Sequence, residues 1–288
     1  MTAVNCRLFN AQNLTHLPAE TWNTPALQEL HLFDNQIAKL PDRLWELENL
    51  EVLNLGHNRL QHISEKIARL TRLHTLDLGY NALGELPDAI GHLPGLNRFL
   101  YLHHNRLTAL PHSIGLLHGL RYLNVSENPI RSLPDSIGQL RSLVELRAQD
   151  NELDGLPDAI GQCAALRELH LKNNRLATLP DSIGQCTQLR KLILENNRLV
   201  EVPATIGNLA HLTELNLRNN RLSTLPETTG RLQKLVYLDL RGNQLHLLPS
   251  GVFQLGALEK LDLRWNADLE LREDAAETLE SRGCVVYR

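Results

Sequence analysis

The stretch LRELHLKNNRLATLPDSIGQCTQ, residues 166–188, contains the pattern that decides the fold of this 288-residue chain. Leucines precede and follow Asn174 at fixed spacings, and a proline closes the motif: Leu166, Leu169, Leu171, Leu176, Leu179 and Pro180. Apolar and polar side chains alternate from Leu169 to Leu171, which predicts a short strand. The leucines of that strand point into the protein, and the residues between them face solvent.

The pattern recurs along the whole chain. Asparagines equivalent to Asn174 stand at Asn35, Asn58, Asn81, Asn105, Asn128, Asn151, Asn197, Asn220, Asn243 and Asn266. Each step is 23 residues except the 24-residue step from Asn81 to Asn105, and one period before Asn35 lies Gln12. The chain therefore divides into about twelve repeats of a single solenoid, residues 1–288, in which each repeat buries its leucines only against its neighbours.

The other fixed positions have local tasks. The asparagine amide can bond the backbone of its own and neighbouring turns where the strand ends. The proline stops the strand, and the residues after it can form only a turn or a short 3₁₀ helix. The ends depart from this pattern and predict an N-terminal capping repeat over residues 1–26, with Arg7 in a leucine position, and a C-terminal cap over residues 267–288. Within that cap we expect a helix over 273–280, ended by Gly283, and a last strand.

The motif LPDSIGQL, residues 133–140, gives the chain its family resemblance. It is similar to the leucine-rich-repeat superfamily and resembles the 23-residue intracellular LPxxIGxL class of Ras-group-related plant proteins, Scribble-like scaffolds and bacterial proteins. The resemblance implies an α/β fold, a right-handed horseshoe with a parallel concave sheet and a convex side of turns and short 3₁₀ helices. It also implies a non-catalytic binding protein whose ligand lies on the concave sheet.

Composition excludes several other classes of protein. A net charge of −4 provides no basic surface for nucleic acid, and no apolar run reaches the roughly 20 residues that a membrane helix needs. The first residues do not resemble a secretory signal, and the four cysteines form no CxxC pair. We therefore expect a cytoplasmic protein and a monomer, and delivery into a host cell stays open as an alternative.

The outward-facing positions lie six, four and two residues before each asparagine, and they differ between the two halves of the chain. From Asn35 to Asn128 they are aromatic and nearly uncharged. Exposed aromatic side chains are typical anchors of protein interfaces, so we predict that a protein partner binds Phe33, Tyr80, Phe99, Tyr101, His103, His104 and Tyr122. Gly56 and Gly79 predict a shallow depression among them. The 24-residue repeat in this region predicts either a bulge or a neutral insertion.

The later repeats carry arginines and lysines beside acidic residues. Arg218, Arg241 and Arg264 are expected to stack, with Asp239 and Asp262 as their partners. A solvated lattice of ion pairs is the favoured interpretation, and an anion-binding surface is the alternative.

No catalytic residues, metal site or cofactor are predicted. Histidines such as His57 and His103 stand two strands apart, too far to share a zinc ion. On the convex side Trp22 and Trp45 occupy a position that is glycine in most repeats. They predict local sealing of the end, or else a contact face for a structural scaffold or homodimer, which is the alternative function.

Overall fold

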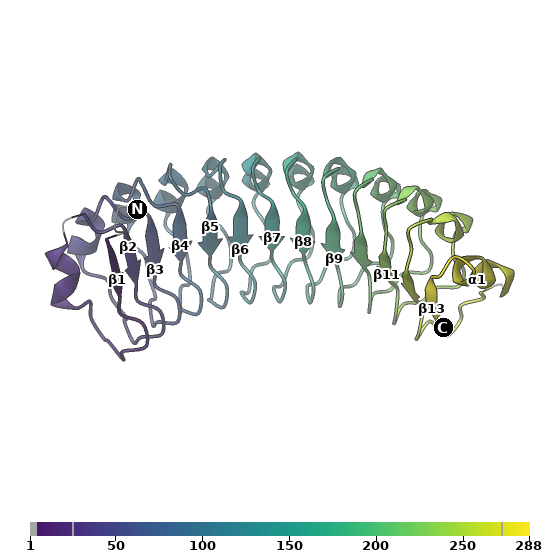
Figure 1. Ribbon diagram of the computed structural model, residues 1–288, viewed down its shortest axis with the longest axis horizontal. Coiled ribbons are helices and arrows are strands. Elements are labelled where there is room, and N and C mark those ends of the chain that lie inside the picture. Colours follow the sequence, from purple (N-terminus) through teal and green to yellow (C-terminus); the bar gives the residue numbers. More distant parts are fainter. Residues whose placement is uncertain (1–4, 25, 272) are drawn as a thin grey trace. The chain divides into compact units, whose positions relative to one another are not determined.

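The computed structural model describes residues 5–24, 26–271 and 273–288, and these fall into two compact units, Met1–Leu143 and Val144–Arg288. Residues 1–4 and 25 of the expected N-terminal capping repeat, and residue 272 of the expected C-terminal cap, lie outside the described residues. In each unit short strands lie side by side, and the 3₁₀ segments form a separate row (Figure 1). Each unit is therefore a leucine-rich-repeat solenoid of the predicted kind.

In its described residues, the N-terminal unit contains six parallel strands and six 3₁₀ segments. The strands are β1 (Cys6–Leu8), β2 (Glu29–His31), β3 (Val52–Asn54), β4 (Thr75–Asp77), β5 (Phe99–Tyr101) and β6 (Tyr122–Asn124). The 3₁₀ segments are η1 (Ala19–Asn23), η2 (Asp42–Glu46), η3 (Glu65–Arg69), η4 (Asp88–His92), η5 (His112–Leu116) and η6 (Asp135–Gln139). Within this unit, consecutive strands from β1 to β6 pair with one another.

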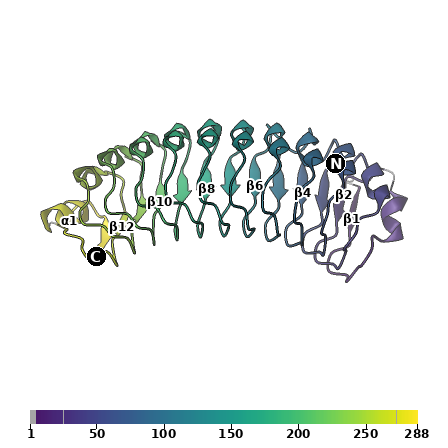
Figure 2. The ribbon, with the colours of Figure 1, turned by 180° about the vertical axis from the view of Figure 1, so that it is seen from behind.

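The C-terminal unit continues the pattern and ends in a helix and a strand, which can be followed from behind in Figure 2. Its strands are β7 (Glu145–Arg147), β8 (Glu168–His170), β9 (Lys191–Ile193), β10 (Glu214–Asn216), β11 (Tyr237–Asp239), β12 (Lys260–Asp262) and β13 (Val285–Tyr287). Its helical segments are η7 (Asp158–Gln162), η8 (Asp181–Gln185), η9 (Ala204–Asn208), η10 (Glu227–Arg231), η11 (Ser250–Gln254) and the α-helix α1 (Glu273–Glu280).

Leucines of the strands form the core of each unit. The middle residues of the strands, such as Leu30, Leu76 and Leu169, are fully buried, whereas the first residues of the same strands face the solvent. Complete burial of a leucine side chain contributes about 1.5–3 kcal/mol. The predicted alternation of inward and outward side chains is therefore confirmed.

The asparagine of each repeat bonds to the backbone of adjacent turns. The amide nitrogen of Asn174 donates to the carbonyl oxygens of Ala148 at 2.8 Å and Leu171 at 3.0 Å. Its side-chain oxygen accepts a hydrogen bond from the Leu153 amide at 3.0 Å. Asn105 makes the equivalent bonds in the N-terminal unit. These side chains satisfy buried peptide groups, as the sequence predicts.

Glycines allow the 3₁₀ segments to pack closely. A methyl group added to Gly161 would lie 2.5 Å from the carbonyl oxygen of Ser182 in the next repeat. The equivalent position near the N-terminus is Trp45, and its side chain is only 1% exposed. Because its indole is packed inside the fold, Trp45 contradicts the alternative of an outer contact face and fits the preferred prediction of local sealing. Trp22 is half-buried, with the Arg43 guanidinium 5.1 Å from its ring centre.

The 24-residue repeat leaves the sheet in register. Thr75 pairs with Phe99 and Asp77 pairs with Tyr101, so β5 aligns with β4 along its whole length. Asn97 and Arg98 lie before β5, and the Arg98 amide bonds to the His74 carbonyl as the equivalent residues do in other repeats. The extra residue is absorbed by the loop, which favours the neutral insertion over the bulge.

The described residues at the C-terminal end contain the helix, the glycine turn and the strand in the order that the sequence predicts. The helix α1 ends at Glu280, and Gly283 follows with a φ of +90°, a conformation that glycine adopts without strain. The Cys284 amide bonds back to the Leu279 carbonyl at 3.1 Å, and β13 then pairs with β12.

Candidate partner-binding surface

The seven residues predicted to bind a partner all lie on one face of the N-terminal sheet. Phe99 and Tyr101 are the first and last residues of β5, and Tyr122 begins β6. The others, Phe33, Tyr80, His103 and His104, come just after their strands end. Together with His57 these side chains form the surface named here the aromatic patch: Phe33, His57, Tyr80, Phe99, Tyr101, His103, His104 and Tyr122.

Ring contacts connect every member of the aromatic patch. Phe33 and Tyr80 each lie 5.8 Å from the His57 ring, and Tyr80 stacks on His104 at 4.4 Å. His103 lies 5.0 Å from Tyr80 and 6.2 Å from Tyr101. Phe99, Tyr101 and Tyr122 then form a cluster with centroid distances of 5.1–6.0 Å. These separations are those of favourable aromatic pairs.

The patch is accessible to solvent. Phe33, Tyr80 and Phe99 are 40–41% exposed. Tyr101, Tyr122 and His103 are half-buried by their neighbours, and His104 is exposed. Large apolar rings that remain this accessible in a folded chain present area that a partner can cover.

The backbone is strained where three of these rings are held. The residue before each ladder asparagine has a positive φ, with values of +54° at His57, +52° at Tyr80 and +53° at His104. Asparagine fills the same position at Asn173 and Asn196, where the left-handed conformation is easier to adopt. A bulky side chain there costs of order 1 kcal/mol or more. The aromatic residues are thus kept at positions where the fold alone favours smaller ones.

His103 fills the space above Gly79. A methyl group added to Gly79 would lie 2.4 Å from the His103 ring, and one added to Gly56 would lie 3.1 Å from the Asp77 carboxylate. The predicted depression is therefore wrong, because neighbouring side chains lean over both glycines. Burial lowers the pKa of His103, so its ring is neutral near pH 7. Within the described residues its Nδ1 atom is buried and has no hydrogen-bond partner.

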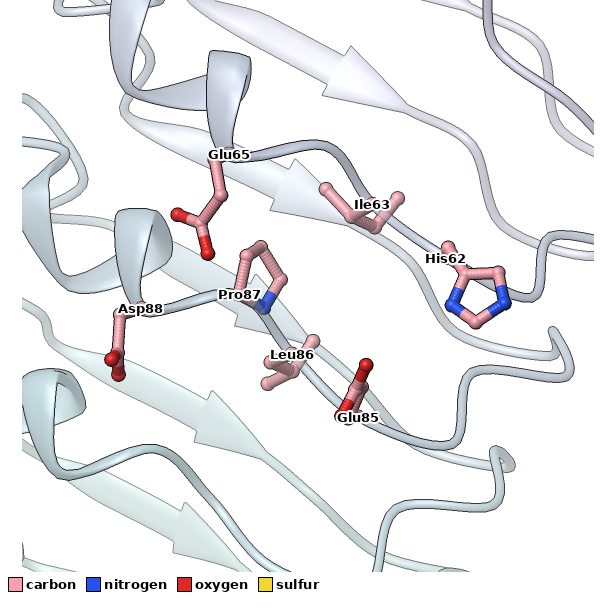
Figure 3. Close-up of a pocket in the computed structure, with 7 residues that line it drawn as sticks. All are labelled: His62, Ile63, Glu65, Glu85, Leu86, Pro87 and Asp88. Carbon is pink, nitrogen blue, oxygen red and sulfur yellow. The ribbon is translucent and has the colours of Figure 1, made fainter.

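A small hollow lies on the 3₁₀ side, away from the aromatic patch. Figure 3 shows its lining side chains, which include His62, Glu65, Glu85 and Asp88 around a cavity of about 290 Å³. The Glu65 carboxylate accepts a hydrogen bond from the Ala89 amide at 3.0 Å, and Asp88 accepts one from a serine hydroxyl at 3.2 Å. These contacts fix the starts of neighbouring 3₁₀ segments, so the acidic groups have a structural role.

The exposed sheet face of the C-terminal unit is dominated by charge. The Asp239 carboxylate accepts two hydrogen bonds from the Arg241 Nε atom, at 2.9 and 3.1 Å, and Asp262 accepts bonds from Arg264 at 2.7 and 2.9 Å. Both aspartates are 0% exposed. The pairing was predicted, but the expectation of a solvated lattice is wrong, because the carboxylates lie beneath the arginines. Arg218 pairs instead with Glu195 at 3.6 Å.

These contacts change the acidity of the groups involved. Burial raises the pKa of Asp239, but hydrogen bonds from Arg241 and Tyr237 outweigh that effect and hold the pKa below its usual value. Burial and the bond to Asp239 raise the pKa of Tyr237 to about 12. Because the guanidinium groups already bond to carboxylates, the ion-pair interpretation is favoured over anion binding.

Family models match nearly the whole chain. The model described as "Leucine rich repeat" matches residues 25–83 and 48–100, and "Leucine-rich repeat region" matches 96–201 and 178–281. The chain belongs to the leucine-rich repeat family. Neither matched model describes a catalytic family, and leucine-rich repeat domains typically mediate protein–protein interactions. No curated protein matches this leucine-rich repeat chain.

Solved structures of repeat proteins resemble the chain. A leucine-rich repeat protein of Leptospira interrogans has 34% identity and a TM-score of 0.88, with 96% of this chain and 70% of that chain covered. The plant peptide hormone receptor RGFR1, in complex with RGF2, has 31% identity and a TM-score of 0.77 over 87% of this chain and 42% of its own. The Toll–Spatzle complex of Drosophila gives 25% identity and 0.74, with 93% and 40% covered.

In the part of the chain that the structure describes, no helix has the length and apolar composition needed to cross a membrane.

Proposed function

We propose that this chain is a non-catalytic protein-binding module whose partner binds the aromatic patch of the N-terminal unit. In this proposal it is a monomer of the 23-residue intracellular LPxxIGxL class, and it works in the cytoplasm in signalling or as an effector-type adaptor. The observation that carries the proposal is the unbroken series of ring contacts from Phe33 to Tyr122 on a solvent-exposed sheet face.

Backbone strain at three of these aromatic residues supports the proposal. His57, Tyr80 and His104 occupy left-handed backbone positions at which asparagine or glycine would be less strained. Such strain is often found at functional sites, where contacts with a ligand justify it. The fold does not need these rings, since the C-terminal unit forms the same turn with Asn173 and Asn196.

The patch also defines the chemistry of its partner. Aromatic rings offer a large contact area at a small loss of side-chain entropy, so the partner should present apolar or aromatic side chains. Two similar solved structures, RGFR1 with RGF2 and Toll with Spatzle, are complexes with another molecule.

A double substitution tests the assignment. Tyr101→Ala together with Tyr122→Ala removes two half-buried rings whose centroids are 5.1 Å apart. We expect affinity capture, followed by mass spectrometry, to lose the partner that the unaltered chain retains, because the centre of the patch would be missing. Circular dichroism should show an unchanged fold, since the leucine core is intact.

The matched control is Leu116→Ala. Leu116 is an apolar side chain, 46% exposed, on η5 of the same unit. This variant should capture the partner as the unaltered chain does. If the double tyrosine variant also captures it undiminished, the aromatic patch is not the binding surface.

The alternative of a scaffold or homodimer joined through Trp22 and Trp45 loses its main support, because Trp45 is buried within its own chain.

A further inference from the structure

A cluster of three possible metal ligands lies across the first two strands of the N-terminal unit. The Cys6 thiol, the Glu29 carboxylate and the His31 imidazole have ligand atoms that all lie within 4.8 Å of one another. Cys6 and Glu29 are paired across β1 and β2, and His31 is two residues beyond Glu29 on the same face. The sequence thus places a sulfur, an oxygen and a nitrogen ligand together.

We infer that Cys6, Glu29 and His31 form a zinc-binding site that joins β1 to β2. Zinc is bound by thiolate at about 2.3 Å and by imidazole or carboxylate at about 2.0–2.2 Å, usually in a tetrahedron. In a tetrahedron of that size, neighbouring ligand atoms are roughly 3.3–3.6 Å apart. The Nε2 atom of His31 already lies 3.3 Å from a Glu29 carboxylate oxygen.

The ligand set selects among metals. Thiolate and imidazole favour zinc and related transition metals, whereas magnesium and calcium prefer oxygen ligands only. Three protein ligands leave a fourth position for water. The side chains of His31 and Glu29 are 23% and 34% exposed, so an ion can reach them from solvent.

The electrostatic surroundings of the cluster also favour a cation. Among the described residues no lysine or arginine forms an ion pair with Glu29, and its partner on β3 is Val52. Arg7, the middle residue of β1, points to the opposite face of the strand.

A second cluster of nearly the same geometry provides a comparison within the chain. Strand β8 has the same sequence as β2, Glu-Leu-His, and Glu145, Glu168 and His170 also lie within 4.8 Å of one another. These carboxylates already have cationic partners. Arg147 bonds to Glu145 at 2.5 Å, and the Lys191 ammonium lies 3.5 Å from Glu168. Because this cluster is neutralised and lacks a thiol, we expect it to bind zinc far more weakly.

The site would stabilise the pairing of the first two strands. Within the residues that the structure describes, β1 pairs with β2 alone, and the outward-facing Leu8 of β1 is 64% exposed. A metal ion bound by both strands would hold β1 to β2, because metal binding couples directly to folding.

The test is metal binding by the full chain without a histidine tag. After equilibrium dialysis against zinc and metal analysis, we expect one bound ion per chain. With cobalt in place of zinc, the protein should show the near-ultraviolet band that arises from thiolate-to-metal charge transfer.

Two ligand variants and one matched control complete the experiment. Cys6→Ser and His31→Gln should each weaken zinc binding by at least about 100-fold, since even residues that only support a ligand contribute 10–100-fold. Cys6→Ser should also abolish the cobalt band. His170→Gln, the matched change on β8, should bind zinc as the unaltered chain does, and circular dichroism checks that all variants are folded.

Three results would overturn the inference. They are the absence of stoichiometric zinc in the unaltered chain, undiminished binding by Cys6→Ser, and loss of the ion in His170→Gln.

Discussion

Replacement of Arg241 by methionine should destabilise the C-terminal unit far more than most changes at a solvent-facing position. Methionine keeps the aliphatic length of the side chain but removes the guanidinium that bonds to Asp239 and lies 3.4 Å from a carboxylate oxygen of Asp262. Both carboxylates are 0% exposed, so they cannot turn to solvent for compensation.

The magnitude follows from what remains after the change. Breaking a buried ion pair by removing one partner costs about 3–5 kcal/mol, because a charge is left buried without compensation. Asp239 would keep the bonds from the Tyr237 hydroxyl at 2.8 Å and from the residue-241 amide at 3.1 Å, and Asp262 would keep Arg264. We therefore expect the lower end of this range, about 3 kcal/mol of unfolding free energy at pH 7.

Urea unfolding followed by circular dichroism measures the effect, and Arg218→Met is the matched control. Arg218 lies on the neighbouring repeat, but its pair with Glu195 is longer, at 3.6 Å, and its side chain is 31% exposed. Pairs of that kind contribute about 0.2–1 kcal/mol. A loss below about 1 kcal/mol for Arg241→Met, equal to that of the control, would refute the view that these buried carboxylates depend on Arg241.

The pH dependence of stability provides an independent check on the interaction between Arg241 and Asp239. Burial raises the pKa of Asp239, but hydrogen bonds from Arg241 and Tyr237 lower it by more, so its folded-state pKa lies below the unfolded value of about 3.9. The stabilisation is therefore complete above that value and is lost as the pH falls through the folded-state pKa. The difference in stability between Arg241→Met and the unaltered chain should narrow below about pH 4.

Two further predictions concern the interior of the C-terminal unit. Asn174→Ala should lower the free energy of unfolding by about 2–4 kcal/mol in urea, since it leaves the Leu153 amide and two carbonyl groups unpaired. Asn173→Gly, at the half-buried neighbouring position, should lower it by less than about 1 kcal/mol. Equal losses would contradict the role of the ladder. Burial raises the pKa of Cys163 to about 12, with a contribution from Cys186, and that of Cys186 to about 11, so neither thiol should be alkylated by iodoacetamide at pH 8 until urea unfolds the chain. Mass spectrometry of the modified peptides checks this, and rapid labelling of the folded protein would show that the thiols are accessible.

The repeat fold could be predicted from sequence because its determinants are local and periodic. The spacing of Leu166, Leu169 and Leu171 before Asn174 specifies a strand and a turn, and the proline after them specifies where the 3₁₀ segment starts. The C-terminal cap was predicted for the same reason, from a short helical segment and Gly283.

The orientation of individual side chains could not be predicted from the sequence. Gly56 and Gly79 suggested a depression, but the Asp77 and His103 side chains cover them. For Trp45 the sequence left both local sealing and an outer contact face open, because its position in the repeat is glycine elsewhere, and the structure shows that the indole is buried.

The Cys6–Glu29–His31 cluster was missed although a signal for it exists. Cys6 and Glu29 are one period apart, and His31 follows Glu29 by two residues, so all three belong to the outward-facing columns. Histidines alone predict no such site, since His57 and His103 stand two strands apart. The signal is a mixed set of sulfur, oxygen and nitrogen ligands on neighbouring repeats.

The loop that carries Asn97 shows how a chain of this kind can change in length. Because pairing partners lie one repeat apart, a residue added within a strand would shift every later side chain to the wrong face. The residue added before β5 has no such effect, since Thr75 still meets Phe99. The segments that precede the strands are therefore natural places for insertions, and an epitope or a short tag grafted beside Asn97 should be displayed next to the aromatic rings without disturbing the leucine core.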